Sequence, residues 1–590
     1  MKQLTETIQT IYRKQPYLLI LLLSISLTIP WITAGEFYTK GEPREATVAV
    51  GILNTGNWIL PSGYADEFAY KPPFMHWFIA AFSLPQGHVT ETTARLPSAI
   101  GLIGITMAFF IFLYKRKKKS FAALAAIILL TSFEMHRSGI EARVDMFLAL
   151  FMVLASLSLF KWEEKALRGY PILIPIFLGC AALVKGPVGI LLPCLVFGIY
   201  LLLLRRYSLW KIIFKNAIVA IPALAILLMW YVLAYKQGGE HFFNLVYAEN
   251  FGRFLGQDSK ALGISYDLGH KGPFWYYIPA IILGFMPWSL LLIFAAFSVS
   301  YKGFFSKIRI KNTPAFLVKL SQLENTTLYS IVSVIIILSF YAIPSSKRSV
   351  YIMPAYPFAA YLLAMLFEWA SETKSRLISI MYQVVKVIAI IMLTLTVFGA
   401  IVDLTPIAAK LIHNAKTLHD VNLFAIAFGH PTVGAIAMWF FLLAVLVASI
   451  LIVRKEKKMV LIFTALSLFI TVQLFLEDVA FPIFKNGYSL QPFAKEIVGK
   501  YPLKDKTYVM NDLSKYRNLY GLNFYMNNNF RNFEKELPQN GYFITGLGYI
   551  DEIRGKYKQY QFDELSRSPN QYNDYDDIII LYKIHKTGNN

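Results

Sequence analysis

The sequence GEPREA at residues 41–46, followed by GNW at 56–58 and YKPP at 70–73, lies just after the first long hydrophobic segment of the chain. These three stretches combine carboxylates and cations beside an apolar segment that is long enough to cross a bilayer. Ionisable side chains held close to a membrane are costly, and they usually have a functional reason. This part of the chain therefore predicts a membrane-embedded fold with a charged site at one surface.

The composition is that of a polytopic membrane protein. Hydrophobic residues make up 56% of the 590 residues, and charged residues only 16%, which is more apolar than a soluble domain. The net charge of +21 is spread over separate short loops, which favours orientation in the membrane and contact with anionic lipid headgroups. The same dispersion argues against nucleic acid as a partner, because nucleic-acid binding gathers basic residues on one face.

Thirteen segments approach the length of a membrane span, which needs about 20 largely apolar residues. A Gly-Pro pair at 186–187 separates two of these segments, since both residues interrupt a helical pattern. The expected spans are 17–34, 96–114, 120–132, 144–160, 171–184, 188–204, 216–235, 275–298, 328–344, 350–370, 384–402, 433–453 and 459–475.

The loops between these segments predict the orientation of the chain. Positively charged short loops remain on the cytoplasmic side of a membrane. With thirteen spans and a cytoplasmic N-terminus, every basic loop falls on that side. The apolar stretch 17–34 is long for a cleaved signal, so we expect it to be retained as a span. The basic loops are 115–119, 161–168, 205–206, 302–319 and 454–458.

Three regions on the opposite, outer side are long enough to carry structure of their own. They are the loop 35–95, the loop 236–274 and the tail 476–590. The apolar run 74–84 in the first loop is too short to span a bilayer and suits a helix that lies in the interface.

The tail differs in character from the rest of the chain. It turns polar and contains three strand-like runs, 508–510, 542–545 and 578–582, with helix-like stretches between them. The expected fold is thus an all-α polytopic membrane domain over 1–475, followed by a small extracytoplasmic α/β domain over 476–590.

Ionisable side chains gather at the outer ends of the expected spans, where positive charge is otherwise scarce. They come from the first loop, from the turns after the third, fifth and ninth spans, and from the loop 236–274. A phosphate-binding site at a membrane surface needs cations that converge from separate segments in this way. The candidates are Glu42, Arg44, Lys71, Arg143, Asp145, Lys185, His270, Lys347 and Arg348.

Several of these residues also have a purely structural interpretation. Arg143 and Asp145 are two residues apart and can pair with each other at a helix start. Lys185 can extend its ammonium group to the interface, and Glu42 can complement the positive end of a helix. A lone histidine such as His270 is seldom a metal ligand. The convergence of these residues on the outer face of the membrane favours a functional role over a purely structural one.

Five motifs in order resemble the bacterial lipid A aminoarabinose transferases, which are relatives of the protein O-mannosyltransferases within the GT-C class of membrane glycosyltransferases. The similarity covers roughly residues 1–370, and beyond them the number of spans and an outer soluble tail agree. The motifs are the first outer loop 41–73 with RLP at 95–97, ARVD at 142–145, KG at 185–186, HKGPFWYY at 270–277, and SKR at 346–348 with YIMP at 351–354.

The resemblance implies transfer of a sugar from a polyprenyl (undecaprenyl) phosphate donor to an acceptor on the outer face of the bacterial inner membrane. The family has an Asp-Glu pair in the first loop, and its Asp is taken as catalytic. Gly41 stands at the Asp position here, so the resemblance carries the carboxylate role over to Glu42. The family also binds a divalent metal through a histidine that matches His270 and an acidic residue whose position is Tyr70 in this chain.

The charged residues fit this chemistry without the family. An acceptor hydroxyl needs a base within hydrogen-bond reach, for which Glu42 is the first candidate and Asp145 the second. The energy comes from the glycosyl phosphate, so no nucleotide loop is needed, and direct displacement predicts inversion at the anomeric carbon. Cations must neutralise the charge that builds on the departing phosphate. For this role we expect Lys71, Arg143, Lys347 and Arg348, together with Arg44 and Lys185.

Three alternatives remain open. Within glycosyl transfer, the acceptor is a lipid A-like glycolipid, another glycolipid or a protein Ser/Thr hydroxyl. A transporter or flippase of lipid-linked sugar would also need outer cations, but many transporters are built from internal repeats and the sequence shows none. An assembly protein that recruits partners through its tail would leave the charged loops unexplained.

Overall fold

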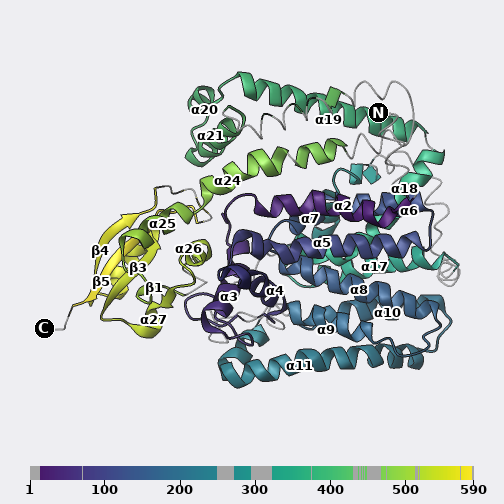
Figure 1. The fold of residues 1–590 in the computed structure, drawn as a ribbon, viewed down its shortest axis with the longest axis horizontal. Helices are drawn as coiled ribbons and strands as arrows, with labels where there is room; N and C mark the ends of the chain where they lie inside the picture. Colours follow the sequence, from purple (N-terminus) through teal and green to yellow (C-terminus); the bar gives the residue numbers. More distant parts are fainter. Residues whose placement is uncertain are drawn as a thin grey trace.

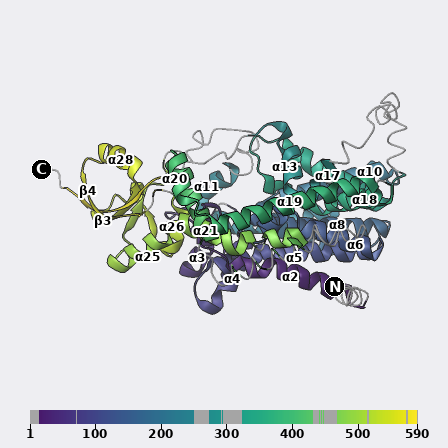
Figure 2. The ribbon, with the colours of Figure 1, turned by 90° about the horizontal axis from the view of Figure 1, so that it is seen from above.

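The computed structural model describes residues 14–248, 272–293, 322–429, 467–511 and 516–587, apart from single positions within these ranges, together with isolated residues between 436 and 447. Helices run side by side as a bundle, and a small sheet lies beyond one end of it (Figure 1). The view turned by 90° shows the sheet at the same end (Figure 2).

Long apolar stretches form the bundle, as the composition predicts. A helix satisfies all its backbone hydrogen bonds internally, so it is the form such segments take in a bilayer. Large aromatic side chains such as Phe109, Phe147 and Phe160 fill the core. The helices are α2 (Pro16–Thr28), α5 (Glu91–Tyr114), α6 (Lys119–Leu130), α7 (Phe133–Gly139), α8 (Val144–Glu164), α9 (Leu173–Lys185), α10 (Val188–Leu204), α11 (Leu209–Tyr247), α13 (Tyr277–Gly284), α17 (Asn325–Ala342), α18 (Tyr356–Thr373), α19 (Ser375–Ile401), α20 (Thr405–Leu411) and α21 (Ala415–Gly429).

The described residues do not confirm the expected count of thirteen spans. Among the described residues, six helical segments are long and apolar enough to cross a membrane, or seven if the bent pair α6 and α7 is one span. The expected spans 171–184 and 188–204 form helices of 13 and 17 residues. At 1.5 Å per residue these are about 20 and 25 Å long, short of the roughly 30 Å hydrocarbon core. The expected spans 433–453 and 459–475 fall largely outside the described residues.

The predicted break between α9 and α10 is present. Helix α9 ends at Lys185, and Gly186 adopts a φ of 83°, which a side chain would disfavour. A Cβ at Gly189 would stand 2.5 Å from the Ala181 carbonyl carbon, so the two helices pack closely just after the turn. The turn leaves Lys185 at the tip of a rigid helix pair.

Two short helices of the first outer loop lie between the bundle and the sheet (Figure 1). They are α3 (Gly41–Thr55) and α4 (Phe74–Ser83). Helix α4 has 10 residues and is therefore about 15 Å long, too short to cross a bilayer, as predicted for the run 74–84. A Cβ at Gly51 would meet the Ser62 carbonyl oxygen at 2.3 Å, so the chain after α3 folds back tightly on it.

The tail contains a five-stranded mixed sheet in the order β2-β1-β3-β5-β4. Strand β1 is parallel to β2 and β3, and β5 is antiparallel to β3 and β4. The three strand-like runs of the sequence form β1, β3 and β5, which confirms a small α/β unit. The elements are α24 (Phe481–Tyr488), α25 (Gln491–Lys500), β1 (Thr507–Val509), α26 (Tyr520–Tyr525), β2 (Phe530–Asn532), α27 (Phe533–Glu536), β3 (Asn540–Gly546), α28 (Ile550–Lys556), β4 (Tyr560–Arg567) and β5 (Ile579–Lys586).

The sheet unit is docked on the first outer loop. The Phe37 N–H donates to the Tyr525 hydroxyl at 2.8 Å, and the Asn54 side chain donates to the Asn527 carbonyl at 2.9 Å. Tyr64 packs into the apolar cluster on one face of the sheet. The loop and the tail, more than 400 residues apart in sequence, therefore form one structure at the same end of the bundle.

Candidate functional site

Glu42, in the first turn of α3, forms a buried ion pair with Arg95 of α5. The Arg95 Nε and Nη2 atoms lie 2.7 and 3.2 Å from the two carboxylate oxygens of Glu42, and the Ala142 N–H donates to Oε1 at 3.0 Å. Burial alone would raise the pKa of the Glu42 carboxyl, but Arg95 and the more distant Lys485 hold it below its usual value. Glu42 is therefore ionised, with both oxygens engaged.

Arg95 is fully buried. It donates hydrogen bonds to backbone carbonyls as well as to the Glu42 carboxylate. Its Nη1 atom donates to the carbonyls of Ile32, Ala34 and Gly35 at 3.2, 3.0 and 3.0 Å. A planar guanidinium suits such a set, since its donors form a rigid fork. The ion pair thus joins the end of the first span to α3 and α5.

Glu45, one turn further along α3, is the centre of a second buried cluster. Its Oε1 accepts from Arg44 at 2.6 Å and from Lys71 at 3.1 Å, and its Oε2 lies 2.9 Å from His76 Nε2 of α4. Burial would raise the pKa of Glu45, yet Lys71, Arg44 and His76 together hold it well below its usual range. The sequence motif thus supplies a carboxylate that positions Lys71.

Asp145, at the start of α8, is the point where several loops meet. It pairs with Lys185 at the end of α9, and the charges of Lys71 and Arg348 lie close enough to act on it. The Lys185 ammonium also lies 4.0 Å from the centre of the Tyr351 ring, as in a cation–π contact. Lys71 acts on both Glu45 and Asp145, so it joins the two clusters.

Arg143 lies close to Gly41, which has no side chain. A Cβ at Gly41 would stand 3.2 Å from Arg143 Nη1. The guanidinium pairs with Glu141, with Nε to Oε2 at 2.8 Å. Burial would lower the pKa of Arg143, but Glu141, Glu42 and Asp145 raise it. Arg143 is therefore a permanent cation between the clusters of Glu42 and Asp145.

Lys347 and Arg348 lie in the same turn but have different surroundings. The Lys347 ammonium is buried and donates to the Pro344 carbonyl at 2.5 Å. The Arg348 side chain is half-buried, and its backbone N–H donates to the Tyr277 hydroxyl at 3.4 Å. The positive charge of Arg348 helps to lower the pKa of Asp145.

The predicted metal ligand His270 lies outside the described residues, as does Tyr70. Within the described part of the chain, no group of three or more His, Cys, Asp or Glu side chains is placed to hold a metal ion. Glu45 and His76, the nearest acid–imidazole pair to Lys71, bond to each other. These residues therefore do not form a metal site by themselves, and the metal stays a prediction.

Sequence reasoning missed four residues that the structure brings to this region. Arg95 belongs to the RLP motif but was not assigned a role, and Glu45 and His76 were not paired with Lys71. A fourth, Glu477, follows the last expected span. It is buried, which raises its pKa to about 7, and its nearest cation, Lys485, is 4.0 Å away. The spacing of Glu42 and Glu45, three residues apart on one helix, was the available signal.

Comparison with known proteins gives matches in sequence. Residues 70–231 match a family described as dolichyl-phosphate-mannose-protein mannosyltransferase. The chain is 27% identical over 354 residues to the undecaprenyl phosphate-alpha-4-amino-4-deoxy-L-arabinose arabinosyl transferase of Enterobacter sp. (strain 638), which is 58% of each chain. It is 27% identical over 259 residues to a second such transferase from Proteus mirabilis, 42% of this chain and 44% of that one. These matches span 58% and 44% of the lengths of the two relatives.

The comparison of structures covers more of the chain. The crystal structure of ArnT from Cupriavidus metallidurans bound to undecaprenyl phosphate superimposes with a TM-score of 0.64 at 17% identity, over 96% of this chain and 97% of that one. The structure of the same protein in the apo state gives the same values. The shared fold covers nearly the whole chain, whereas these two sequence matches cover 58% and 42% of it. In sequence and in fold, the chain therefore resembles the GT-C membrane glycosyltransferases of the lipid A aminoarabinose transferase type.

Proposed function

We propose that this protein transfers a sugar from a polyprenyl phosphate donor, such as undecaprenyl phosphate, to a lipid A-like glycolipid at the outer face of the bacterial inner membrane. Relatives that are 27% identical carry that donor in their names, and a structure with the same fold is bound to undecaprenyl phosphate. The reaction needs no nucleotide, because the glycosyl phosphate itself supplies the energy.

One observation carries the proposal: cations from three separate segments act on Asp145. Lys71 comes from the first outer loop, Lys185 from the C-terminal end of α9, and Arg348 from the turn after α17. Cations are costly to hold together unless anions balance them, so such a cluster favours an anionic ligand. A phosphate diester at the end of a lipid chain is an anion of the right kind for a membrane surface.

The cations have distinct roles in this mechanism. Lys71, Arg348 and Lys185 bind the donor phosphate and stabilise the negative charge that grows on the bridging oxygen as the anomeric C–O bond breaks. Arg143 adds permanent positive charge beside them. Arg44 acts through Glu45, whose carboxylate it shares with Lys71. Lys347 is bonded to a backbone carbonyl and has to leave it to bind phosphate.

The structure favours Asp145 over Glu42 as the base for the acceptor hydroxyl. The Glu42 oxygens are engaged by Arg95 and Ala142. Lys185 bonds Asp145 through Oδ1, and no hydrogen bond to Oδ2 is found within the described residues. A base must reach the hydroxyl directly, so the carboxylate with an oxygen that accepts no hydrogen bond is the better placed one. In this proposal Glu42 positions the loop, and its action as a base requires release from Arg95.

The test uses the purified full-length protein in lipid nanodiscs with a radiolabelled polyprenyl phosphate sugar. We expect label to move to an extracted glycolipid, with transfer lost in Asp145→Asn and strongly reduced in Arg348→Gln. The matched control is Lys165→Gln, an exposed cation in the basic loop after α8, which should transfer normally. If the label stays on the donor and only moves to the other leaflet, the protein is a transporter and the proposed transfer reaction is wrong.

A second acceptor class has one observation in its favour. The family model that matches 70–231 is described by protein mannosyl transfer, so a Ser or Thr hydroxyl of a protein is the alternative acceptor. The same assay separates the two, because label then appears in acid-precipitated protein and not in the lipid extract.

A further inference from the structure

We propose that His76 is a positioning residue for donor binding: it holds the Glu45 carboxylate in the orientation that directs Lys71 to the donor phosphate. The inference rests on the proposed function for the role of Lys71. His76 lies in the first turn of α4 and is buried, and the proposed mechanism gives it no role. Lys71 joins the clusters of Glu45 and Asp145, so a residue that controls its position acts on both.

Lys71 and His76 bind opposite oxygens of the same carboxylate. The Lys71 ammonium lies 3.1 Å from Glu45 Oε1, and His76 Nε2 lies 2.9 Å from Oε2. The short segment between them begins with two prolines, at 72 and 73, whose rings restrict the backbone. The last torsion of a glutamate side chain has only a broad intrinsic preference. The plane of the Glu45 carboxylate is therefore set by its hydrogen bonds, and His76 fixes the oxygen that Lys71 does not use.

The remaining oxygen of Glu45 has two cations. Oε1 accepts from Arg44 at 2.6 Å as well as from Lys71. A phosphate that draws Lys71 away leaves Oε1 paired with Arg44 and Oε2 paired with His76. The buried carboxylate then keeps a partner on each oxygen, which avoids the cost of an uncompensated charge. Without His76, the carboxylate is free to turn both oxygens toward its cations, and Lys71 is less available to the donor.

The second nitrogen of His76 indicates which form of the ring acts. Nδ1 is buried and has no hydrogen-bond partner among the residues that the structure describes. An N–H at this atom would have no acceptor, so the hydrogen bonds assign a neutral ring with its proton on Nε2, which donates to Glu45. A neutral amide that reaches the same oxygen should therefore replace the imidazole.

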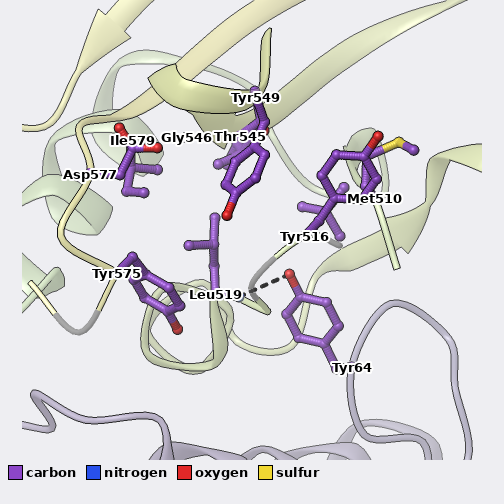
Figure 3. A pocket seen from close by; sticks show the side chains of 12 residues that line it. Tyr64, Met510, Tyr516, Leu519, Thr545, Gly546, Tyr549, Tyr575, Asp577 and Ile579 are labelled. Atoms are coloured by element: carbon purple, nitrogen blue, oxygen red, sulfur yellow. Dashed lines mark hydrogen bonds between the residues drawn. The ribbon is translucent and has the colours of Figure 1, made fainter. Parts of the chain in front are cut away.

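The loop that carries Lys71 also has an anchor that does not involve His76. Tyr64 is buried against the sheet unit, and its hydroxyl accepts from the Leu519 N–H at 3.1 Å (Figure 3). The backbone of the loop is thus held to the tail on the other side of Lys71. What His76 adds is the orientation of one carboxylate, and this can be tested apart from the folding of the loop.

The test measures binding of tritiated undecaprenyl phosphate, the carrier without its sugar, to the full-length protein in nanodiscs. We expect His76→Leu to weaken binding about tenfold, as loss of a residue that orients a metal ligand does, and His76→Gln to restore it. The matched control is Ser83→Ala at the other end of α4. It removes a buried hydrogen bond of 2.8 Å to Thr93 of α5 and should leave the affinity unchanged.

A double-variant cycle separates positioning from a general loss of packing, because residues that act through each other are not additive. If His76 acts through Lys71, His76→Leu should change the affinity by less than about twofold in a Lys71→Met background. A loss of about tenfold in that background as well would overturn the inference. So would equal weakening in Ser83→Ala, or binding by His76→Gln that is as weak as that of His76→Leu.

Sugar transfer is measured on the same proteins, so the two proposals can fail separately. If the carrier binds as expected in every variant but no label leaves the glycosyl donor, the role of His76 stands and the proposed transfer is wrong. If the parent transfers label and His76→Leu binds the carrier as the parent does, the proposed function stands and the positioning role is wrong.

Discussion

The guanidinium of Arg95 holds three parts of the chain together. It pairs with Glu42 of α3, it belongs to α5, and it binds carbonyls at the exit of the first span. Its side chain is fully buried, so its charge has no water to replace those partners. Removing one member of a buried pair is far more damaging than replacing both, because it leaves an uncompensated charge.

We therefore expect Arg95→Met to destabilise the protein by about 3–5 kcal/mol, seen as a large fall in the thermal unfolding midpoint in detergent. Arg168→Met, in an exposed loop at the far end of the bundle, is the control. The double variant Glu42→Leu with Arg95→Met should be less destabilised than Arg95→Met alone. A midpoint unchanged in Arg95→Met would show that the pair does not hold this end of the bundle together.

Glu477 makes stability depend on pH. Burial raises its pKa from 4.5 in the unfolded chain to about 7 in the folded protein. The folded state therefore binds the proton more tightly, and the stabilisation is complete below pH 4.5 and is lost as pH rises to about 7. Glu477→Gln stays neutral, so its midpoint should exceed that of the parent at pH 8 and equal it at pH 4.5.

The control for this comparison is Glu496→Gln, on an exposed pair with Lys500. Its midpoint should follow the parent at every pH. If the unfolding midpoints of the parent and of Glu477→Gln change in parallel between pH 4.5 and 8, Glu477 does not have a raised pKa in the folded protein.

At this scale the sequence indicates which residue types matter but not how they pair. Glu42 and Glu45 lie three residues apart and share a face of α3, yet one pairs with Arg95 and the other with Lys71. Those partners lie 53 and 26 residues away along the chain. Only the packing of α5 and α4 against α3 decides which carboxylate each cation meets.

At the scale of elements, the first turn of α3 begins with a glycine. Gly41 is the first residue of the helix, and a Cβ there would stand 3.2 Å from Arg143 Nη1. A guanidinium at the end of a flexible side chain can move by the few tenths of an ångström that this requires. A carboxylate in that turn would face both the helix N-terminus and the cation.

Gly41→Asp should accordingly be tolerated and raise stability by about 0.3–1 kcal/mol, since acidic groups favour a helix N-terminus. Gly41→Lys places a cation against Arg143 and should destabilise. The thermal midpoints of the two variants, measured at low and high salt, check the electrostatic origin of the difference. Equal thermal midpoints for Gly41→Asp and Gly41→Lys would exclude an electrostatic origin.

Element prediction succeeded where a chemical break or a strong pattern was present. Gly186 and Pro187 correctly predicted the turn between α9 and α10, and β1, β3 and β5 are apolar strands of the sheet. Strand β2 was missed because only one of its three residues, Phe530, is apolar, and β4 because it carries charges, as edge strands commonly do. The count of thirteen spans is not confirmed among the described residues, because apolar length does not distinguish a full span from a short helix packed within a bundle.

The whole molecule depends on the docking of the tail onto the first outer loop. The Tyr525 hydroxyl accepts from the Phe37 N–H at 2.8 Å and donates to Glu91 at 2.7 Å. No local pattern in the sequence links residues so far apart, and the sequence analysis predicted only that both regions lie on the outer side. That orientation stays a prediction of the charge distribution in the loops.

Tyr525→Phe should loosen this docking by roughly 1–3 kcal/mol, because it leaves the Phe37 N–H unpaired in a buried position. Hydrogen exchange followed by mass spectrometry should show faster exchange in peptides that cover 35–40. Tyr542→Phe, whose hydroxyl has no hydrogen-bond partner among the described residues, is the control. Unchanged exchange in Tyr525→Phe would mean that other contacts suffice.

Lys71, shared between Glu45 and Asp145, has a consequence for turnover. The resting protein already pairs Lys71 with its own carboxylates, so under the proposed function an arriving carrier headgroup would have to displace one anion in favour of another. Such an exchange makes affinity moderate and lets the internal carboxylates reclaim the lysine once the sugar has gone. The carboxylates that the carrier phosphate had displaced from Lys71 would then displace the spent carrier lipid in turn.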